Sequence, residues 1–512
     1  SDGQLTVGSQ IRRSLATEEG ILNYTQSGGT VIVGNDAAPE DNRGVLEILN
    51  SGSVFRHTGG GLYIARAQDN PEWASLYLAP ETVEFGPGTQ IQLGYTNTPG
   101  SQQIGIYSTV PIPDLVVDNS SGNAPTAKLW NVPLTVTEQL DIESGANFHA
   151  NGLDLNLKGN LIANGTFTPD GNTTYFTGTS GQAITGSPAF YNLTKDSTAN
   201  TLTLNADVTV ANELRLLQGT LDDNNQTLTA QGHVWMDATH THGGSGNGIL
   251  FAGTETQNLR GDGTWGKLSI DNPAGVYVPQ GNTVSICNTL NLLAGIFDIG
   301  KNLLVLSTDA AITGNAFSET NMVQTNISFT DAGIKKYFPA ISSATDFVYP
   351  IGSAGKYTPV EFNFDQLDAG SYIRVKAADE RHPGIIEDEE DPDPEITDAS
   401  NVLQYHWVVE TENISNLKGD MVLSYAEEDV TYTAPYDASD YITARLLKDS
   451  TNWNKYTETS FNENPPYQMT FNFDGADDGG IEGDYTAGVD GVGFNGAIPD
   501  SVPIFYTVQD GS

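Results

Sequence analysis

The side chains best suited to chemistry in this sequence are the carboxylates of a short, glycine-rich segment at residues 474–484. Its acidic residues are Asp474, Asp477, Asp478, Glu482 and Asp484. Calcium takes about six to eight oxygen ligands, and the glycines would let the segment fold back around an ion. The spacing differs from that of an EF-hand loop. We therefore expect either a calcium site or an acidic loop without an ion, and calcium is the only cofactor that the sequence suggests.

Histidines suggest a second possible metal site. His233, His240 and His242 lie close together in the sequence, and in a strand the last two would share one face. No fourth ligand of a zinc site accompanies them. The surrounding Thr and Gly residues are typical of a surface turn, so we favour a solvated loop.

Catalytic chemistry has few candidates. Glycoside hydrolysis needs two facing carboxylates, but Asp222 and Asp223 are adjacent and fit a turn better. Polysaccharide lyases need a Lys or Arg base, and cationic residues are scattered here. Cys287 lies in an apolar run without a nearby base, so we expect a small core residue. We assign no catalytic or cofactor-binding residue and expect no enzyme activity.

The composition excludes several classes of partner. The 512 residues include 22 Lys and Arg against 64 Asp and Glu, for a formal net charge of -42. Such a surface would repel nucleic acid and an anionic membrane. No run of about 18 apolar residues is present, so we expect no membrane insertion. One cysteine permits no disulfide within the chain.

Internal repeats dominate the first part of the chain. Residues 134–145 recur as residues 208–219 and 284–295, at offsets of 74 and 76. The positions that match in type are Val136, Val210 and Ile286; Leu140, Leu214 and Leu290; Ile142, Leu216 and Leu292; and Gly145, Gly219 and Gly295. Several strings agree on nearly one offset, which indicates a repeat architecture.

A second string supports the same period. Residues 175–186 and 250–261 share Phe, Gly, Gln and Gly at an offset of 75. The matched pairs are Phe176 and Phe251, Gly178 and Gly253, Gln182 and Gln257, and Gly186 and Gly261. A weaker copy lies at residues 45–64, where Ile48, Gly52 and Phe55 correspond to Ile142, Gly145 and Phe148. We place the copies near 45–64, 115–157, 193–232 and 268–306.

The local pattern predicts an all-β fold. Apolar residues alternate in short runs that end at Gly or Asn, which is typical of strands and turns. We expect a right-handed parallel β-helix over residues 1–316, with coils of about 20–25 residues and three or four coils per copy. The alternative is a series of separate β-sandwich repeats.

The pattern changes near residue 315, where longer alternating strands begin. We expect a β-sandwich over residues 317–506, with Trp407 in its core, and residues 507–512 as the start of a following module. Residues 385–398 combine acids and prolines and predict an exposed loop.

These motifs resemble a known family. The string F-x-G-x-x-x-Q-x-[IL]-x-G, followed by DNSSG- or DNPAG-like turns, is similar to repeats of giant cell-surface adhesins of Bacteroidota, which the type IX secretion system exports. FVYPIGSAGKYTPV and NVLQYHWVV resemble the sandwich domain that alternates with those repeats. Some members are the mobile adhesins of gliding motility.

The resemblance implies a structural and adhesive segment, a stalk or adhesin, at the cell surface. Its partners would be surface glycans or other surface ligands, flanking modules of the same long chain, and the secretion machinery. Proteins of this phylum carry O-glycans at Asp-Ser/Thr triplets, which marks Ser197, Ser450 and Ser501 as candidate glycosylation sites.

Two other functions stay open. Many β-helix proteins are polysaccharide lyases or hydrolases, and these need a groove with clustered carboxylates or a cationic base. A carbohydrate-binding module needs exposed aromatic side chains in a row. Trp73, Trp130, Trp265 and Tyr175 could form one, although such residues are more often core or coil-stacking residues.

Overall fold

The computed structural model describes residues 3–13, 20–39, 43–70, 73–325, 332–368, 371–385, 399–414, 416–447, 453–456, 461–474, 480–490 and 492. Strands make up 59% of the structure, and no α-helix occurs among the described residues. The chain forms two compact units, Ser1–Leu250 (unit 1) and Phe251–Ser512 (unit 2). No helix in the described part is long and apolar enough to cross a membrane.

The strands of unit 1 are β1 (Gln4–Val7), β2 (Asn23–Val33), β3 (Leu46–Ile64), β4 (Leu76–Phe85), β5 (Gln90–Leu93), β6 (Gln103–Ser108), β7 (Ile112–Val117), β8 (Thr126–Leu129), β9 (Leu134–Ile142), β10 (Asn147–His149), β11 (Leu155–Leu157), β12 (Asn160–Ala163), β13 (Thr166–Thr168), β14 (Thr173–Phe176), β15 (Gln182–Gly186), β16 (Ala189–Leu204), β17 (Val208–Asp222), β18 (Thr227–Ala230), β19 (His233–Met236) and β20 (Thr239–Thr241). β21 (Gly248–Phe251) includes the division between the units.

The strands of unit 2 are β22 (Gln257–Arg260), β23 (Thr264–Asp271), β24 (Val276–Tyr277), β25 (Thr283–Ala294), β26 (Phe297–Gly300), β27 (Leu303–Leu306), β28 (Ala311–Gly314), β29 (Val323–Thr325), β30 (Gly333–Phe338), β31 (Thr345–Tyr349), β32 (Ile351–Ser353), β33 (Lys356–Tyr357), β34 (Val360–Gln366), β35 (Ser371–Ala378), β36 (His406–Glu412), β37 (Lys418–Ser424), β38 (Tyr441–Leu447), β39 (Trp453–Tyr456), β40 (Phe461–Asn462), β41 (Gln468–Asp474) and β42 (Gly483–Val489). Short 3-10 helices are η1 (Ala399–Asn401), η2 (Glu427–Asp429) and η3 (Ala438–Asp440).

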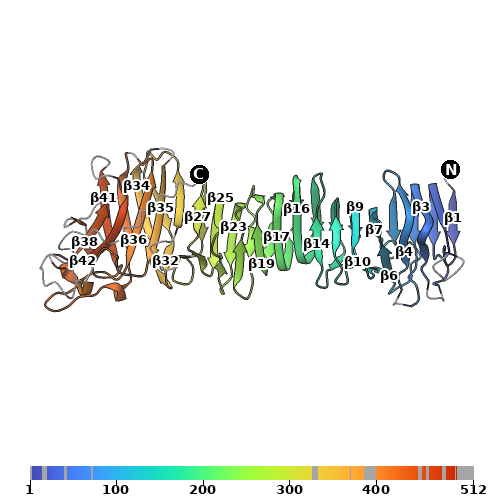
Figure 1. Cartoon of the computed structure of the whole chain (residues 1–512), viewed down its shortest axis with the longest axis horizontal. Coiled ribbons are helices and arrows are strands. Elements are labelled where there is room, and N and C mark those ends of the chain that lie inside the picture. Colours follow the sequence, from blue (N-terminus) through green and yellow to red (C-terminus); the bar gives the residue numbers. More distant parts are fainter. Residues whose placement is uncertain are drawn as a thin grey trace. The chain divides into compact units, whose positions relative to one another are not determined.

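Unit 1 is a parallel β-solenoid, in which strands of successive coils pair side by side (Figure 1). A first ladder joins β4, β6, β8, β10 and β13, and a second joins β5, β7, β9, β12 and β15. A third joins β9, β11, β14, β16, β17 and β19. The parallel pairing confirms the predicted β-helix and excludes separate antiparallel sandwich repeats in this region.

The repeated apolar positions form the core of the solenoid. Val136, Leu140 and Ile142 of one copy and their counterparts in the other two copies are all at most 1% exposed. Neighbours in a strand point to opposite faces, so this alternation sends one set of side chains inward. A single coil cannot enclose such a set, and stacking buries it against the coils on either side.

The repeated glycines occupy turns that other residues would strain. Gly145, Gly219 and Gly295 have φ angles of 84°, 80° and 94°. A Cβ atom on Gly295 would lie 1.8 Å from the carbonyl oxygen of Asn272. Glycine is therefore required at this corner for two reasons: the backbone is left-handed, and the preceding coil approaches too closely for a Cβ atom.

The matched glutamine makes the same two hydrogen bonds in both copies, one from a glycine N–H and one from an asparagine side chain. We call this arrangement the glutamine bracket. In unit 1, the Gln182 Oε1 atom accepts from Gly178 N at 2.9 Å and from Asn200 Nδ2 at 3.0 Å. In unit 2, the Gln257 Oε1 atom accepts from Gly253 N at 2.8 Å and from Asn272 Nδ2 at 3.0 Å. The bracket is the physical basis of the repeated G-x-x-x-Q string, because it satisfies buried polar groups at a corner.

One sequence repeat does not equal a whole number of coils. Leu140 and Leu214 match at the offset of 74 residues. Leu140 pairs with Leu161 in the second ladder, whereas Leu214 pairs with Leu193 in the third. The second copy is thus displaced by one ladder from the first. The same positions point inward, but the outward side chains of the two copies lie on different ladders.

Unit 2 begins as solenoid and ends as a β-sandwich. β24, β26, β29 and β32 continue one parallel ladder, and β25, β27 and β30 continue another. Antiparallel pairing then joins β30, β35, β36, β42, β38 and β39 in one sheet and β31, β34, β37, β41 and β40 in a second. This order confirms the predicted fold class of a β-helix followed by a β-sandwich.

The two sandwich sheets pack through aromatic side chains. Phe338 lies 5.1 Å from Phe364 between ring centroids, and Phe471 lies 4.8 Å from Tyr485. Trp407 is fully buried, as predicted, and its indole N–H donates to the Thr358 carbonyl at 3.1 Å. A buried aromatic ring with its polar atom satisfied is a strong core anchor.

Solenoid and sandwich meet without a separating linker inside unit 2. β30 pairs in parallel with β27 along one edge and antiparallel with β35 along the other. Lys336 of β30 donates from Nζ to the Ser307 and Thr308 carbonyls, at 2.7 Å each. The change of pairing is spread over residues 323–375, and parallel pairing continues through β32, past residue 316, where the sequence placed the end of the β-helix.

The prediction for Cys287 is wrong. Its side chain is exposed. The β23–β25 pairing shifts register there, since Trp265 faces Ile286 but Lys267 faces Thr289. Val284 and Ile286 are buried, so the alternation of the strand already places Cys287, the next residue, on the outer face.

Candidate functional site

A row of aromatic side chains lies on the outer face of the first ladder in unit 1. Tyr77 of β4 pairs directly with Tyr107 of β6, and their ring centroids are 5.2 Å apart. Trp130 follows β8 and continues the register, because its N–H donates to the Ile106 carbonyl at 2.8 Å. Trp73 precedes β4, 6.4 Å from Tyr77 between ring centroids. We call Trp73, Tyr77, Tyr107 and Trp130 the aromatic row.

The alternation of the strands forces this row outward. Leu76 and Leu78 of β4 are fully buried, so Tyr77 between them must point away from the core. Ile106 and Leu129 place Tyr107 and Trp130 in the same way. Trp73 is 40% exposed, and the other members of the row are partly exposed.

Hydrogen bonds hold the row in place. The Tyr77 hydroxyl accepts from Ala74 N at 3.3 Å, and the side chain of Trp130 acts to lower the pKa of Tyr77. Burial raises the pKa of Tyr77, and the nearby Glu47 carboxylate adds to this rise. The tyrosine therefore stays neutral, and its ring is fixed between neighbouring coils.

Glu47 lies beside the row and is ion-paired with two arginines. It pairs with Tyr77 in the β3–β4 register and accepts from Arg13 Nε at 2.9 Å and from the Arg43 guanidinium. Burial acts to raise the pKa of Glu47, but the two arginines outweigh it and lower the pKa. The arrangement can offer neutral, ordered aromatic rings to an apolar ligand surface.

The prediction for the aromatic residues is partly correct. Trp73 and Trp130 belong to the row, but Trp265 is fully buried in unit 2 and Tyr175 lies on β14 in the third ladder. Tyr77 and Tyr107 were missed. The strings LYL and GIYS mark both tyrosines as outward in a strand, but only the coil register makes them neighbours.

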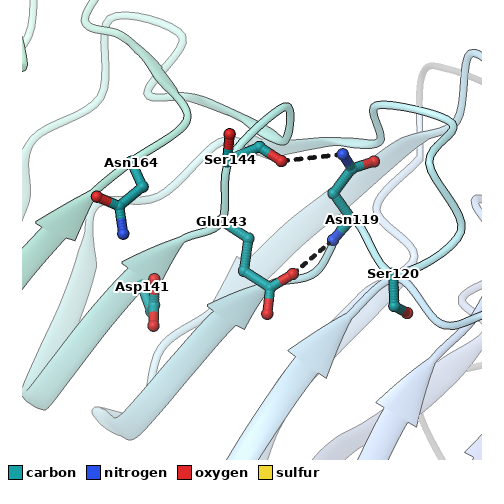
Figure 2. Close-up of a pocket in the computed structure, with 6 residues that line it drawn as sticks. All are labelled: Asn119, Ser120, Asp141, Glu143, Ser144 and Asn164. Carbon is teal, nitrogen blue, oxygen red and sulfur yellow. Dashed lines mark hydrogen bonds between the residues drawn. The ribbon is translucent and has the colours of Figure 1, made fainter.

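A shallow polar hollow of about 680 Å³ lies on unit 1. Its lining residues are Asn119, Ser120, Asp141, Glu143, Ser144 and Asn164, shown in Figure 2. The Glu143 carboxylate accepts from Asn119 N at 2.9 Å, and the Asn119 amide donates to the Ser144 carbonyl at 2.9 Å. These bonds join the turn after β9 to the turn of the preceding coil.

Carboxylates in and beside this hollow disfavour each other's charge. Burial raises the pKa of Asp141. Burial also raises the pKa of Glu143, and Asp118 and Asp141 push it in the same direction. One protonated acid beside a carboxylate is the pairing that glycoside hydrolysis uses. Asp141 and Glu143 lie two residues apart on one coil, and the β7–β9 pairing brings Asp118 of the preceding coil beside them.

The two clustered histidines are buried, so the predicted solvated loop is wrong for them. His240 Nε2 lies 2.9 Å and His242 Nδ1 lies 2.6 Å from the Asp223 Oδ2 atom. Burial acts to raise the pKa of Asp223, but the bonds to both histidines outweigh it and lower the pKa. His233 is exposed on β19. The histidines thus fix a turn of the solenoid through one carboxylate.

The predicted calcium segment is only partly within the described residues, which exclude Asp477 and Asp478. Asp474 ends β41, whereas Asp484 lies on β42 of the other sandwich sheet. Asp484 is fully buried and accepts from His382 Nε2 at 2.8 Å, and Glu482 precedes β42. Among the described residues, no group of three or more His, Cys, Asp or Glu side chains is placed to hold a metal ion.

Of the three glycosylation candidates, only Ser197 lies in the described part of the chain. Its side chain is partly exposed and donates to the Gly178 carbonyl at 2.6 Å. Ser450 and Ser501 lie outside the described residues.

Comparison with known proteins returned no match to a family model, a curated protein or a solved structure. The class of this protein is therefore defined by its own structure, a parallel β-solenoid that continues into an antiparallel β-sandwich.

Proposed function

We propose that this chain is a structural and adhesive segment of a large secreted cell-surface protein, acting as a stalk or adhesin. The observation that carries the proposal is the unbroken backbone pairing between coils. In unit 1, one ladder runs through the Leu134–Leu155, Thr174–Leu193 and Leu193–Leu214 pairs. Bending such a ladder strains many hydrogen bonds together, so a solenoid can hold a binding surface at a distance from the cell.

The proposal includes a surface ligand and an extracellular location. The resemblance of the repeats to Bacteroidota adhesins supports export by type IX secretion, with flanking modules of the same chain and the secretion machinery as partners. Some of those relatives act in gliding motility, which makes a role in motility part of the same proposal. The net charge of -42 suits a long exposed protein that must stay soluble.

Adhesion of coated beads tests this function. Beads that carry the full chain are passed in buffer flow over surfaces coated with different glycans, with beads carrying heat-unfolded chain as the control. We expect the folded chain alone to retain beads on at least one surface. Equal retention of both bead types, or none on any surface, would contradict the adhesive role.

A carbohydrate-active enzyme is the second candidate, and the hollow around Glu143 is the observation that favours it. The raised pKa values of Glu143 and Asp141 suit an acid–carboxylate pair. Release of reducing ends from a panel of polysaccharides tests this candidate. An activity that Glu143→Gln abolishes would establish the enzyme, and an activity unchanged in that variant would exclude this hollow as its site.

A further inference from the structure

We infer that the aromatic row of unit 1 is a binding site for a neutral glycan chain. The inference rests on the proposed adhesive function and names the ligand and the surface through which adhesion acts. It uses the contacts of Trp73, Tyr77, Tyr107 and Trp130, which lie together only in the folded chain.

The spacing of the row suits a polymer of sugar rings. Tyr77, Tyr107 and Trp130 come from successive strands of one ladder, and neighbouring strands lie about 4.8 Å apart. A hexose ring in an extended glycan covers a similar length. A glycan that crosses the strands would therefore meet about one aromatic side chain per sugar.

The chemistry of the row suits the apolar faces of sugars. Aromatic rings pack on C–H groups, while tyrosine hydroxyl and indole N–H groups can bond to nearby hydroxyls. The side chain of Lys128 lies on the same outer face, two residues before Trp130, and pairs in register with His149 on β10. These two side chains add hydrogen-bond donors beside the rings.

Most outward positions on this ladder are not aromatic. Four positions in register on β6, β8, β10 and β13 are all polar, namely Gln103, Thr126, Asn147 and Thr166. Tyr77, Tyr107 and Trp130 instead form one column, and Trp73, which precedes β4, lies beside Tyr77 with 40% of its surface exposed. A column of ordered, partly exposed rings on an otherwise polar face is typical of a ligand surface.

Charge selects a neutral glycan over an acidic one. Glu47, Arg13 and Arg43 beside the row are ion-paired with one another, and all three side chains are buried, so the row presents no exposed cation from this group to an acidic ligand. The whole chain carries a net charge of -42, which repels a polyanion. Polymers of neutral hexoses avoid this repulsion, whereas polymers of uronic acids do not.

Affinity electrophoresis of the full chain tests the site, with hydroxyethyl cellulose and laminarin as neutral polysaccharides and alginate as the acidic one. We expect retardation by at least one neutral polymer and none by alginate. Tyr107→Ala and Trp130→Ala should each weaken binding on the order of tenfold, as expected for a central contact. Trp130→Phe should keep most of the binding, because an aromatic ring remains.

Tyr191→Ala is the matched control, since Tyr191 is a 38% exposed aromatic residue of unit 1 outside the row. It should leave the affinity unchanged. Circular dichroism of every variant checks that the solenoid is folded, and Trp73→Ala, at the 40% exposed member of the row, should weaken binding and serves if an alanine variant is not folded. Binding that survives both alanine variants, prefers alginate, or is absent for all neutral polymers would overturn the inference. Bead adhesion that persists in folded row variants would leave the adhesive function standing and remove only this site.

Discussion

Two corners of the solenoid, one in each unit, share a bracket but differ in their interior. Gln182 with Asn200 in unit 1 and Gln257 with Asn272 in unit 2 make equivalent hydrogen bonds. Lys195 is fully buried beside the first bracket, and Ile270 occupies the matching position near the second.

The lysine keeps its ammonium group satisfied inside the core. Its Nζ donates to the Ser197 carbonyl at 2.8 Å and to the Gln218 carbonyl at 3.4 Å. Burial lowers the pKa of Lys195. The two corners show that the repeat preserves the backbone geometry of the corner. The side chain packed beneath it can be apolar, or polar if its polar atoms have hydrogen-bond partners.

The largest expected effect comes from the corner glycines. Gly295→Ala should destabilise unit 2 by about 3 kcal/mol or more, since it combines a positive φ with a Cβ placed 1.8 Å from a carbonyl oxygen. Gly219→Ala should behave alike in unit 1, where the Cβ would lie 2.2 Å from the Ser197 oxygen. Urea unfolding measures both.

Gly281→Ala separates the two causes of that effect. Gly281 has a φ of 93° but no atom within 4 Å of its Cβ position. We expect a loss of only about 1 kcal/mol there, from backbone strain alone. Equal losses at Gly281 and Gly295 would show that the close approach between coils is unimportant.

The next largest effect is expected from acid, which should lower the stability of unit 2 at a higher pH than that of unit 1. Burial, together with His382, lowers the pKa of His406 in unit 2 from 6.5 to about 3. Below pH 6.5 the unfolded chain gains a proton that the folded unit does not bind, so this contribution is full above pH 6.5 and falls as the pH decreases. From His406 alone the loss is about 1.4 kcal/mol per pH unit, or about 2 kcal/mol between pH 6.5 and 5. Asp429 of the same unit, whose pKa burial raises to about 6, offsets part of this loss below pH 6.

Asp223 in unit 1 responds at lower pH. Its pKa is held below the usual 3.8, so its contribution is present above pH 3.8 and is lost only below it. Hydrogen–deuterium exchange on separate peptides, corrected for intrinsic rates, should show unit 2 losing protection first between pH 6.5 and 5. A steeper loss in unit 1, or the same slope in His406→Gln, would contradict this order.

The brackets should contribute equally in both corners. Gln182→Leu and Gln257→Leu each leave a buried glycine N–H and a buried asparagine amide without their shared acceptor. We expect each variant to lose about 2 kcal/mol in urea unfolding. Gln226→Leu, at a partly buried glutamine outside the bracket, is the control and should be near neutral. A loss in only one corner would mean that the brackets differ in role.

The smallest effect is expected at Lys195. Lys195→Ile installs the residue of the second corner and should change the stability of unit 1 by less than about 1 kcal/mol, because two lost hydrogen bonds offset the removed burial of a charge. Thermal unfolding measures the change, with Ile270→Val, expected to lose about 1 kcal/mol, as the reference. A loss of several kcal/mol would show that the lysine is essential to its corner.

The sequence by itself determined the local structure. Alternation placed Leu140, Leu214 and Leu290 inward, and the repeated Gly145 and Gly219 marked turns that need a positive φ. These features follow from the pleat of a strand and from the conformational freedom of glycine, both of which act over a few neighbouring residues.

Only the tertiary structure decided which coils meet and in what register. Leu76 pairs with Ile106 of the next coil, 30 residues later, whereas Leu155 pairs with Thr174, only 19 residues later. The difference arises because turns of different length connect the strands. That variation placed Tyr107 beside Tyr77 and His240 against Asp223. It also displaced the second sequence copy by one ladder from the first. The outer surface depends on loop length and stacking, while the inner surface depends on the local pattern, so sequence reasoning recovered the core and missed much of the candidate site.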